Sequence, residues 1–452
     1  MRADPAEAQA FLDQHPGIES VQLVITDVNG VARGKSISRE ELLPMYRHGR
    51  NVAGSILSLD SRGEDVEETG LVWSSGDADK ACWPVPARLF VAPWLRRPTA
   101  GLLMTMHEAD GSPCAADPRH ALARVVERLA QDGFTPVVAA ELEFYLVEQD
   151  GERVRPARGL VGGQPSPRHD TYGLGKLEEM SPLFDEMYHA AAQQGLPART
   201  LMSEYAPAQF EVSLAHRADA LAAADDAVMW KRLVRGVAAR HGLTATFMAK
   251  PFGELAGCGL HVHVSLADAA GRNLFEAEDP AGTALLRHGI GGLVATMPEC
   301  MSVFAPNANS YRRFRRLSYA PVAPTWGVNN RSVGFRIPAG PPASRHVEHR
   351  ICGADANPYL AIATVLAGLH HGIRECLDPG APVTGNGYEL PPDPRVPLDW
   401  HAALAAAAQS TFLNEALGAD FMNTFMAVKR AECDRFNAEP TALDHAWYLK
   451  QA

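Results

Sequence analysis

The sequence has no long apolar run, no closely spaced cysteines and no excess of positive charge. No apolar stretch approaches the roughly 18 residues of a membrane-spanning helix, and the first residues, MRADPAEAQAFLDQHPG, contain no apolar signal core. The chain carries 42 Lys and Arg against 53 Asp and Glu, a net charge of −11, whereas general binding to nucleic acids or anionic membranes needs a basic surface. We therefore expect a cytoplasmic protein that binds neither nucleic acid nor membrane.

The seven cysteines are scattered, and no two of them have the C-x-x-C spacing of a metal or redox motif. This excludes a disulfide framework and a cysteine zinc site, so we expect buried, reduced thiols. Internal repeats and low-complexity tracts are also missing. What remains is an ordinary globular composition, 46% hydrophobic and 21% charged. The length allows about three domains, or one large and one smaller unit.

Turn and capping signals divide the chain near residue 110. The elements expected before this point are a helix over 4–15 and strands at 21–27, 31–37, 87–92 and 102–107. The Asn29-Gly30 turn joins the first two strands as a β-hairpin. Asp117 and Pro118 then provide a helix cap and a first-turn proline. A small, strand-rich unit therefore precedes a second, larger one.

The larger unit alternates helices with strands. Its expected helices cover 118–131, 181–194, 217–241, 284–298, 356–374 and 421–437. Its expected strands cover 134–147, 208–214, 244–249, 260–266, 333–337 and 347–351. Residues 149–180 are polar and rich in Gly, Pro and Arg, which is typical of a long surface loop.

One glycine-containing segment is similar to a phosphate-binding loop but does not match it. Three residues separate Gly30 from Gly34, whereas the pattern G-x-x-x-x-G-K-[ST] needs four. The segment also follows a hairpin turn and not the strand-to-helix elbow of a true phosphate loop. We therefore do not expect residues 30–36 to bind phosphate.

Four of the expected strands place metal-ligand side chains on one face, because residues i and i+2 of a strand point the same way. These faces carry Glu141 with Glu143, Glu211 with Gln209 and Ser213, His261 with His263 and Ser265, and Glu348 with Arg350. For any single strand, a solvated polar face is the simpler interpretation. Taken together, the faces are rich in Glu and His, and paired carboxylates need nearby cations. Such a set suits Mg²⁺ or Mn²⁺ better than zinc.

Eight arginines lie in the same part of the chain. They are Arg312, Arg313, Arg315, Arg316, Arg331, Arg336, Arg345 and Arg350. Any one of them could belong to a solvated basic patch. Beside carboxylate metal ligands in a net-acidic chain, we interpret them as an anion clamp, because guanidinium groups bind carboxylate and phosphate through two hydrogen bonds. Divalent ions next to arginines suit phosphoryl transfer.

In their order along the chain, these motifs resemble the glutamine synthetase superfamily, most strongly at 137–360. They are Glu141-Leu-Glu143-Phe-Tyr, Glu204-Tyr-Ala-Pro-Ala-Gln-Phe-Glu211, Gly257-Cys-Gly-Leu-His261-Val-His263-Val-Ser265, Asn309-Ser-Tyr-Arg-Arg313, Asn330-Arg331-Ser and Arg345-His-Val-Glu348-His-Arg350. The resemblance implies an α+β fold with a small N-terminal β-grasp domain at 1–112. A larger glutamine synthetase-type catalytic α/β domain would follow at 113–452, with an antiparallel sheet forming the active-site funnel.

The resemblance also implies a homo-oligomer, usually a dodecamer of two six-membered rings, in which a neighbour's N-terminal domain closes each site. Glu143, Glu204 and Glu211 would hold one Mg²⁺ or Mn²⁺ ion, and Glu141, His261 and Glu348 a second. His263, Ser265, Arg331 and Arg336 would contact ATP, while Arg313, Arg350 and the backbone at Gly257 would bind glutamate. The implied catalytic residues are Arg331, Arg313 and Tyr319, and the implied reaction joins glutamate to an amine through a γ-glutamyl phosphate.

Two positions depart from the pattern of ammonium-using members. Those members place a Glu before an Ala-Pro pair, where this chain has Tyr319, and an Asp before Gly-Ser, where it has Ala53. Without these acids, a desolvated ammonium ion lacks compensating charge. We therefore expect a small amine other than ammonium, such as putrescine, another polyamine or an alkylamine, as in the γ-glutamylpolyamine synthetase branch. Tyr319 and Trp326 could offer cation–π contacts.

Further details and alternatives stay open. Asp60, Glu64 or Asp65 could hold the distal charge of the amine, although a solvated loop is the simpler interpretation. His346 replaces an arginine near the nucleotide, and Tyr388 stands where some relatives are adenylylated, although a plain loop tyrosine is the simpler interpretation. The alternative functions are ordinary glutamine synthetase using ammonium, a non-catalytic binding relative, and a kinase that phosphorylates a carboxylate and releases it.

Overall fold

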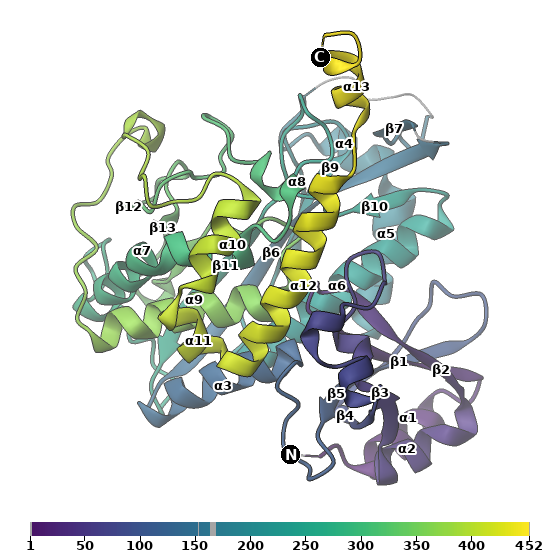
Figure 1. Ribbon diagram of the computed structural model, residues 1–452. Coiled ribbons are helices and arrows are strands. Elements are labelled where there is room, and N and C mark those ends of the chain that lie inside the picture. The colour runs from purple at the N-terminus through teal and green to yellow at the C-terminus, as the bar shows by residue number, and fades with distance from the viewer. Residues whose placement is uncertain (1, 152, 163–168, 452) are drawn as a thin grey trace.

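The computed structural model describes residues 2–151, 153–162 and 169–451 and contains two separate sheets (Figure 1). The first has five strands in the order β2-β1-β5-β4-β3. Their bounds are β1 Ser20–Thr26, β2 Ala32–Ser38, β3 Arg50–Ala53, β4 Asp79–Val91 and β5 Thr99–His107. β1 and β2 form the predicted hairpin, and β1 pairs in parallel with β5. The segment 30–36 is thus part of a hairpin, as its sequence indicated.

Two helices cover this sheet, α1 at Pro5–Gln14 and α2 at Leu42–His48. Asp4 caps α1 by accepting a hydrogen bond from the Ala6 N–H at 2.8 Å. Leu12 of α1, Met45 of α2 and Leu102 of β5 share one hydrophobic core. The predicted helix and the strands of this unit are confirmed, whereas α2 and β3 were not predicted.

The second sheet has nine strands in the order β12-β13-β14-β11-β6-β9-β8, with β7 and β10 also paired to β6. Their bounds are β6 Thr135–Asp150, β7 Arg153–Pro156, β8 Ala198–Ser203, β9 Gln209–Leu214, β10 Thr244–Thr246, β11 Leu260–Ala267, β12 Trp326–Val328, β13 Phe335–Ile337 and β14 Val347–His349. Neighbouring strands are antiparallel apart from β12 and β13, which run parallel. The prediction of an antiparallel sheet is therefore wrong at that edge, while the α+β fold class is confirmed.

Helices surround the second sheet. Six match predicted helices: α3 Pro118–Gln131, α5 Ser181–Gln193, α6 Ala220–Arg240, α7 Ala284–Phe304, α9 Pro358–Arg374 and α12 Ala419–Ala438. Five were not predicted: α4 Leu174–Glu179, α8 Ala308–Tyr311, α10 Trp400–Ala408, α11 Thr411–Leu417 and α13 Ala442–Tyr448. In Figure 1, α12 runs along the front of the molecule and leads to α13 at the top. Across the described ranges, no helix has the length and apolar character needed to cross a membrane.

Two sequence-based expectations need correction. The segment 149–180 is not simply a loop, because it contains β7 and α4, although residues 152 and 163–168 lie outside the described part. α7 also continues through Pro298 to Phe304 and does not end at residue 298. Met297, Cys300 and Met301 are buried on either side of this proline. Packing of that face therefore outweighs the hydrogen bond that proline removes.

Buried polar contacts join the two units. Arg88 of β4 donates to Asp225 and Asp226 of α6 at 3.1 and 2.9 Å. The Asn357 amide at the start of α9 donates to the carbonyls of Asp27 and Val28 at 3.0 and 3.1 Å. The predicted boundary between 112 and 113 lies in the connection between β5 and α3. These contacts fix the N-terminal sheet against α6 and α9.

Candidate active site

The strand register places acidic and histidine side chains on one face of the second sheet. Glu141 of β6 lies opposite His261 of β11 on one side and Ser213 of β9 on the other. Glu143 lies opposite Glu211 across β6 and β9. On β14, Glu348 pairs with His263 of β11 and with Arg336 of β13. Each ligand-type residue therefore faces another one on the neighbouring strand.

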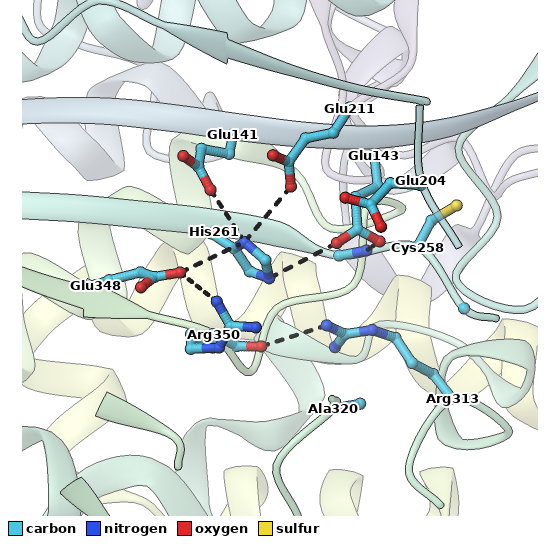
Figure 2. A network of polar contacts seen from close by, with 12 residues as sticks. Glu141, Glu143, Glu204, Glu211, Cys258, His261, Arg313, Ala320, Glu348 and Arg350 are labelled. Carbon is cyan, nitrogen blue, oxygen red and sulfur yellow. Dashed lines mark hydrogen bonds and ion pairs between the residues drawn. The ribbon is translucent and has the colours of Figure 1, made fainter. Parts of the chain in front are cut away.

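His261 lies at the centre of this cluster (Figure 2). Its Nδ1 atom is 3.2 Å from a carboxylate oxygen of Glu141, 3.7 Å from Glu348 and 3.9 Å from Glu211, while Nε2 is 3.8 Å from Glu143. Single donor atoms of Glu141, Glu211 and His261 all lie within 4.8 Å of one another, and so do those of Glu141, His263 and Glu348. Residues that are up to 207 positions apart in sequence, from Glu141 to Glu348, thus converge on one face of the sheet.

Glu143 and Glu204 lie together at one end of the cluster, next to Cys258 (Figure 2). Glu204 directly follows β8, and Glu143 accepts a hydrogen bond from the Gly259 N–H at 2.8 Å. Burial, with the neighbouring Glu204 charge, raises the pKa of Glu143 to about 8. Burial and the Glu141 charge likewise raise the pKa of Glu211 well above its ordinary value. These carboxylates are therefore short of positive charge within the chain.

The carboxylates at the other end of the cluster behave in the opposite way. Burial acts to raise the pKa of Glu348, but Arg350 and the neighbouring His261, His263 and Arg336 lower it to about 2. Burial is likewise outweighed at Glu141, where hydrogen bonds to His261 and His263 hold the pKa below its ordinary value. Desolvation and the Arg350 charge lower the pKa of His261 to about 4, so this imidazole is neutral at pH 7. A neutral imidazole among ionised carboxylates is a donor set for divalent cations.

Two predicted substrate-binding arginines lie beside the carboxylates. The Arg350 guanidinium hydrogen-bonds Glu348, while its Nε atom is buried and lacks a hydrogen-bond partner among the described residues. Arg313 donates to the carbonyls of Ile351 and Arg350 at 2.8 and 3.3 Å. At Gly257, a Cβ atom would lie 2.8 Å from Arg313 Cγ, so this glycine lets the backbone pack against the arginine.

The predicted nucleotide contacts are spread over two places. Arg336 donates to Glu348 at 2.8 Å and to Asn329 at 3.1 Å, and its Nε atom is buried without a partner in the described ranges. His263 and Ser265 follow His261 along β11, and Ser265 lines a cavity of about 300 Å³. Arg331 is exposed, and its charge acts on the half-buried carboxylate of Glu204.

The predicted amine-binding residues are only partly available. Tyr319 is 63% exposed and has a left-handed backbone with φ +55° in a turn organised by the Ser318 hydroxyl. Trp326, in contrast, is buried and donates its indole N–H to the Gly380 carbonyl at 3.0 Å, which corrects its proposed cation–π role. Asp60 is buried, accepts hydrogen bonds from the Arg62 and Glu64 N–H groups and pairs with Arg435 of α12. The Asp60 carboxylate therefore stabilises its own loop.

One residue of the region, His216, did not stand out from the sequence. His216 lies beyond the end of β9, so strand alternation does not determine the position of its side chain. The strand ends at Leu214, and the turn brings His216 beside His263 and His346. Tyr388, on a short 3₁₀ helix at Gly387–Glu389, is buried.

Comparisons with known proteins agree with this geometry. The family model "Glutamine synthetase, catalytic domain" matches residues 115–448. Gamma-glutamylputrescine synthetase PuuA of Escherichia coli (strain K12) is 36% identical over 99% of this chain and 95% of its own length. Glutamate–isopropylamine ligase of a Pseudomonas species is 32% identical over 92% and 90%. A solved structure of a GmaS/ADP complex has a TM-score of 0.84 at 29% identity and covers 97% of this chain and 99% of the other.

The chain therefore belongs to the glutamine synthetase family. This membership confirms the predicted family and the predicted class of enzyme, a ligase.

Proposed function

We propose that the protein is an ATP-dependent ligase that joins the side-chain carboxylate of glutamate to a small amine other than ammonium. The observation that carries the proposal is the convergence of five glutamates and His261 around one point of the sheet, with arginines beside them. The similarity to relatives named for ligating putrescine and isopropylamine supports the same reaction type.

The donor set fits two or more divalent cations, Mg²⁺ or Mn²⁺. As the family resemblance implies, Glu143, Glu204 and Glu211 would hold one ion, and Glu141, His261 and Glu348 another. The raised pKa values of Glu143 and Glu211 support this assignment, because buried carboxylates that lack cations retain protons. When bound, such ions neutralise the charge of a nucleotide's phosphates.

The residues of the chain have separate tasks in the two steps of this reaction. In the first step, a glutamate carboxylate oxygen bonds to the γ-phosphorus of ATP as the bond to ADP breaks. Arg350 would offer glutamate, and Arg336 would offer the phosphates, an Nε–H group that has no partner among the described residues. In the second step, the neutral amine nitrogen bonds to the acyl carbon and loses a proton, while the acyl C–O bond breaks and inorganic phosphate leaves. Arg331 and Arg313 would stabilise the charge that develops on phosphate, and Ser265 and His263 would contribute nucleotide contacts.

The preference for a larger amine is proposed from two positions. Tyr319 is exposed at the turn after Arg313, and Ala53 ends β3 of the N-terminal domain. Neither side chain supplies the negative charge that desolvated ammonium needs. An aromatic face at Tyr319 instead attracts an alkylammonium group by a cation–π contact of about 0.5–2 kcal/mol.

The test is a panel of ammonium, alkylamines and diamines with glutamate, ATP and Mg²⁺, read out by phosphate release and product mass. We expect a γ-glutamyl amide with at least one alkylamine or diamine at a higher kcat/KM than with ammonium. The highest kcat/KM with ammonium and none with diamines would instead identify a glutamine synthetase. Phosphorylated carboxylate without amide would identify a kinase. Glu143→Gln should abolish turnover, whereas Glu127→Gln, on the exposed face of α3, should not.

We also propose that the active enzyme is a homo-oligomer, the dodecamer of two six-membered rings implied by the family resemblance. In the single chain, Leu443, Trp447 and Leu449 near the C-terminus are 56%, 60% and 74% exposed. Clustered exposed apolar side chains support burial in an assembly. Light scattering of the purified protein tests the state directly, and a monomer with full activity would contradict the proposal.

A further inference from the structure

Three histidines from separate elements meet beside the carboxylate cluster. His216 follows β9, His263 lies in β11 and His346 immediately precedes β14. Their ring centroids are 5.9 Å apart for His216 and His263, 5.3 Å for His216 and His346, and 5.1 Å for His263 and His346. One ring nitrogen of each lies within 4.8 Å of the other two. Neither His216 nor His346 has a part in the reaction proposed above.

Hydrogen bonds orient two of these rings toward one another. His346 Nδ1 donates to the Ser344 carbonyl at 2.7 Å, which leaves Nε2 of the neutral ring as a lone-pair donor. That Nε2 atom is 2.9 Å from Nδ1 of His263. An imidazole whose outer N–H is held by a carbonyl, with its other nitrogen turned inward, has the orientation typical of a metal ligand.

The backbone around the cluster is well anchored. Arg217, next to His216, exchanges two 2.8 Å hydrogen bonds with Val138 of β6. Val347, next to His346, pairs with Val264, and the Asn273 amide donates to the Arg345 carbonyl at 2.8 Å. The rings therefore converge because the sheet holds their backbones, and only the side chains need to adjust to a ligand.

We propose that His216, His263 and His346 form a separate site for one borderline transition-metal ion, such as Zn²⁺, Ni²⁺ or Cu²⁺. Three imidazoles suit these ions, whereas the neighbouring carboxylate cluster suits Mg²⁺ or Mn²⁺. Nitrogens at about 2.0–2.1 Å from a tetrahedral ion are roughly 3.3 Å from each other, which small ring rotations provide here. With the ion on Nδ1 of His263, the ring proton lies on Nε2, which is 3.4 Å from Glu141. The cavity of about 300 Å³ leaves an open position for water or another ligand.

A metal ion bound at this site would also affect the neighbouring proposed active site, because the two sites meet at His263. Its Nε2 atom is 3.4 Å from Glu141, one of the ligands of the proposed Mg²⁺ site. The cavity beside the histidines is also lined by Ser265, a proposed nucleotide contact. A transition ion there therefore weakens nucleotide binding. This consequence rests on the proposed function, but the existence of the site does not.

The test is equilibrium titration of the metal-free protein with Co²⁺ in a large excess of Mg²⁺, followed by visible absorption, with Zn²⁺ as competitor. We expect one Co²⁺ per chain with the intense absorption of a four-coordinate, nitrogen-rich site. His216→Ala and His346→Gln should each weaken binding at least tenfold. His401→Ala, an exposed histidine of α10, is the matched control and should leave binding unchanged. Melting curves confirm that each variant is folded.

Several outcomes would overturn the proposal. One is that Co²⁺ gives no intense absorption. Another is that His216→Ala binds Co²⁺ as tightly as the wild type. A third is that Glu211→Gln abolishes Co²⁺ binding while His346→Gln does not. Nucleotide affinity is measured separately, with and without Zn²⁺, by displacement of a fluorescent ATP analogue. If Zn²⁺ binds without changing nucleotide affinity, the metal site is supported and only its link to the proposed function is contradicted.

Discussion

At the scale of single residues, the charged side chains of the site hold one another in place. Glu348 accepts hydrogen bonds from both Arg336 and Arg350, and Arg313 donates to the Arg350 carbonyl. A residue assigned to the substrate thus also supports a metal ligand. Any substitution of Arg350 has two consequences, and the choice of replacement can separate them.

We predict that Arg350→Ala raises the KM for glutamate roughly 10- to 150-fold, the equivalent of about 1.5–3 kcal/mol for a lost charge-assisted hydrogen bond. It also lowers the melting temperature, because buried Glu348 loses one of its cations. Arg350→Lys retains a positive charge beside Glu348 but lacks the planar guanidinium group that can bind a carboxylate through two hydrogen bonds. Its melting temperature should therefore recover while the KM stays high. An unchanged KM in both variants would remove Arg350 from substrate binding.

The amine preference is also a property of single residues. We predict that Tyr319→Glu combined with Ala53→Asp shifts the ratio of kcat/KM toward ammonium at least tenfold, because the two acids compensate a desolvated cation. The matched control, Tyr319→Gln with Ala53→Asn, has the same shape without the charge. An equal shift in both double variants would mean that side-chain size, not charge, selects the amine.

At the scale of elements, the site could be predicted wherever strand alternation determines it. Glu141 and Glu143 share a face of β6, as His261 and His263 share a face of β11, and the register then places Glu141 opposite His261. Alternation says nothing about a residue beyond the end of its strand, so His216 was missed. Local signals also failed at α7, where a buried face carries the helix through Pro298, and at the parallel pairing of β12 with β13. Both are decided by contacts that are distant in sequence.

The pairing of β6 with β9 leads to a prediction about pH. The pKa of Glu143 is about 8 in the folded, metal-free chain, against about 4.3 for an unfolded glutamate. The stability that this proton confers is complete below the lower value and is lost as the pH rises through about 8. Metal binding needs the ionised carboxylate, so it strengthens over the same range. We expect Mg²⁺ or Mn²⁺ to raise the melting temperature more at pH 8 than at pH 6.

The measurement is differential scanning fluorimetry with EDTA or excess metal at the two pH values. Glu143→Gln has no carboxylate to ionise at this position, so its metal-induced shift and the pH dependence of that shift should both be smaller than in the wild type. A wild-type shift of the same size at pH 6 and pH 8 would contradict the proposed role of Glu143 as a metal ligand.

At the scale of the whole molecule, the relative position of the two sheets depends on the polar contacts between the two units. Asp225 and Asp226 of α6 are almost fully buried and receive Arg88 from β4, Arg119 from α3 and Arg217 from the loop after β9. The Tyr359 hydroxyl of α9 also donates to Asp225 at 2.7 Å. Arg217 is next to His216, so the network that joins the two units also touches the edge of the site.

We predict that Arg88→Ala lowers the free energy of unfolding by at least about 2 kcal/mol, because two buried carboxylates lose hydrogen bonds to a cation. The loss should remain below the roughly 3–5 kcal/mol of an unpaired buried charge, since Arg119 and Arg217 still compensate the aspartates. The matched control is Arg97→Ala, whose pair with Glu19 is exposed on both sides and contributes at most about 1 kcal/mol. Urea unfolding, followed by tryptophan fluorescence for the whole chain, measures both variants. Equal losses would show that the junction depends on apolar packing and not on this network.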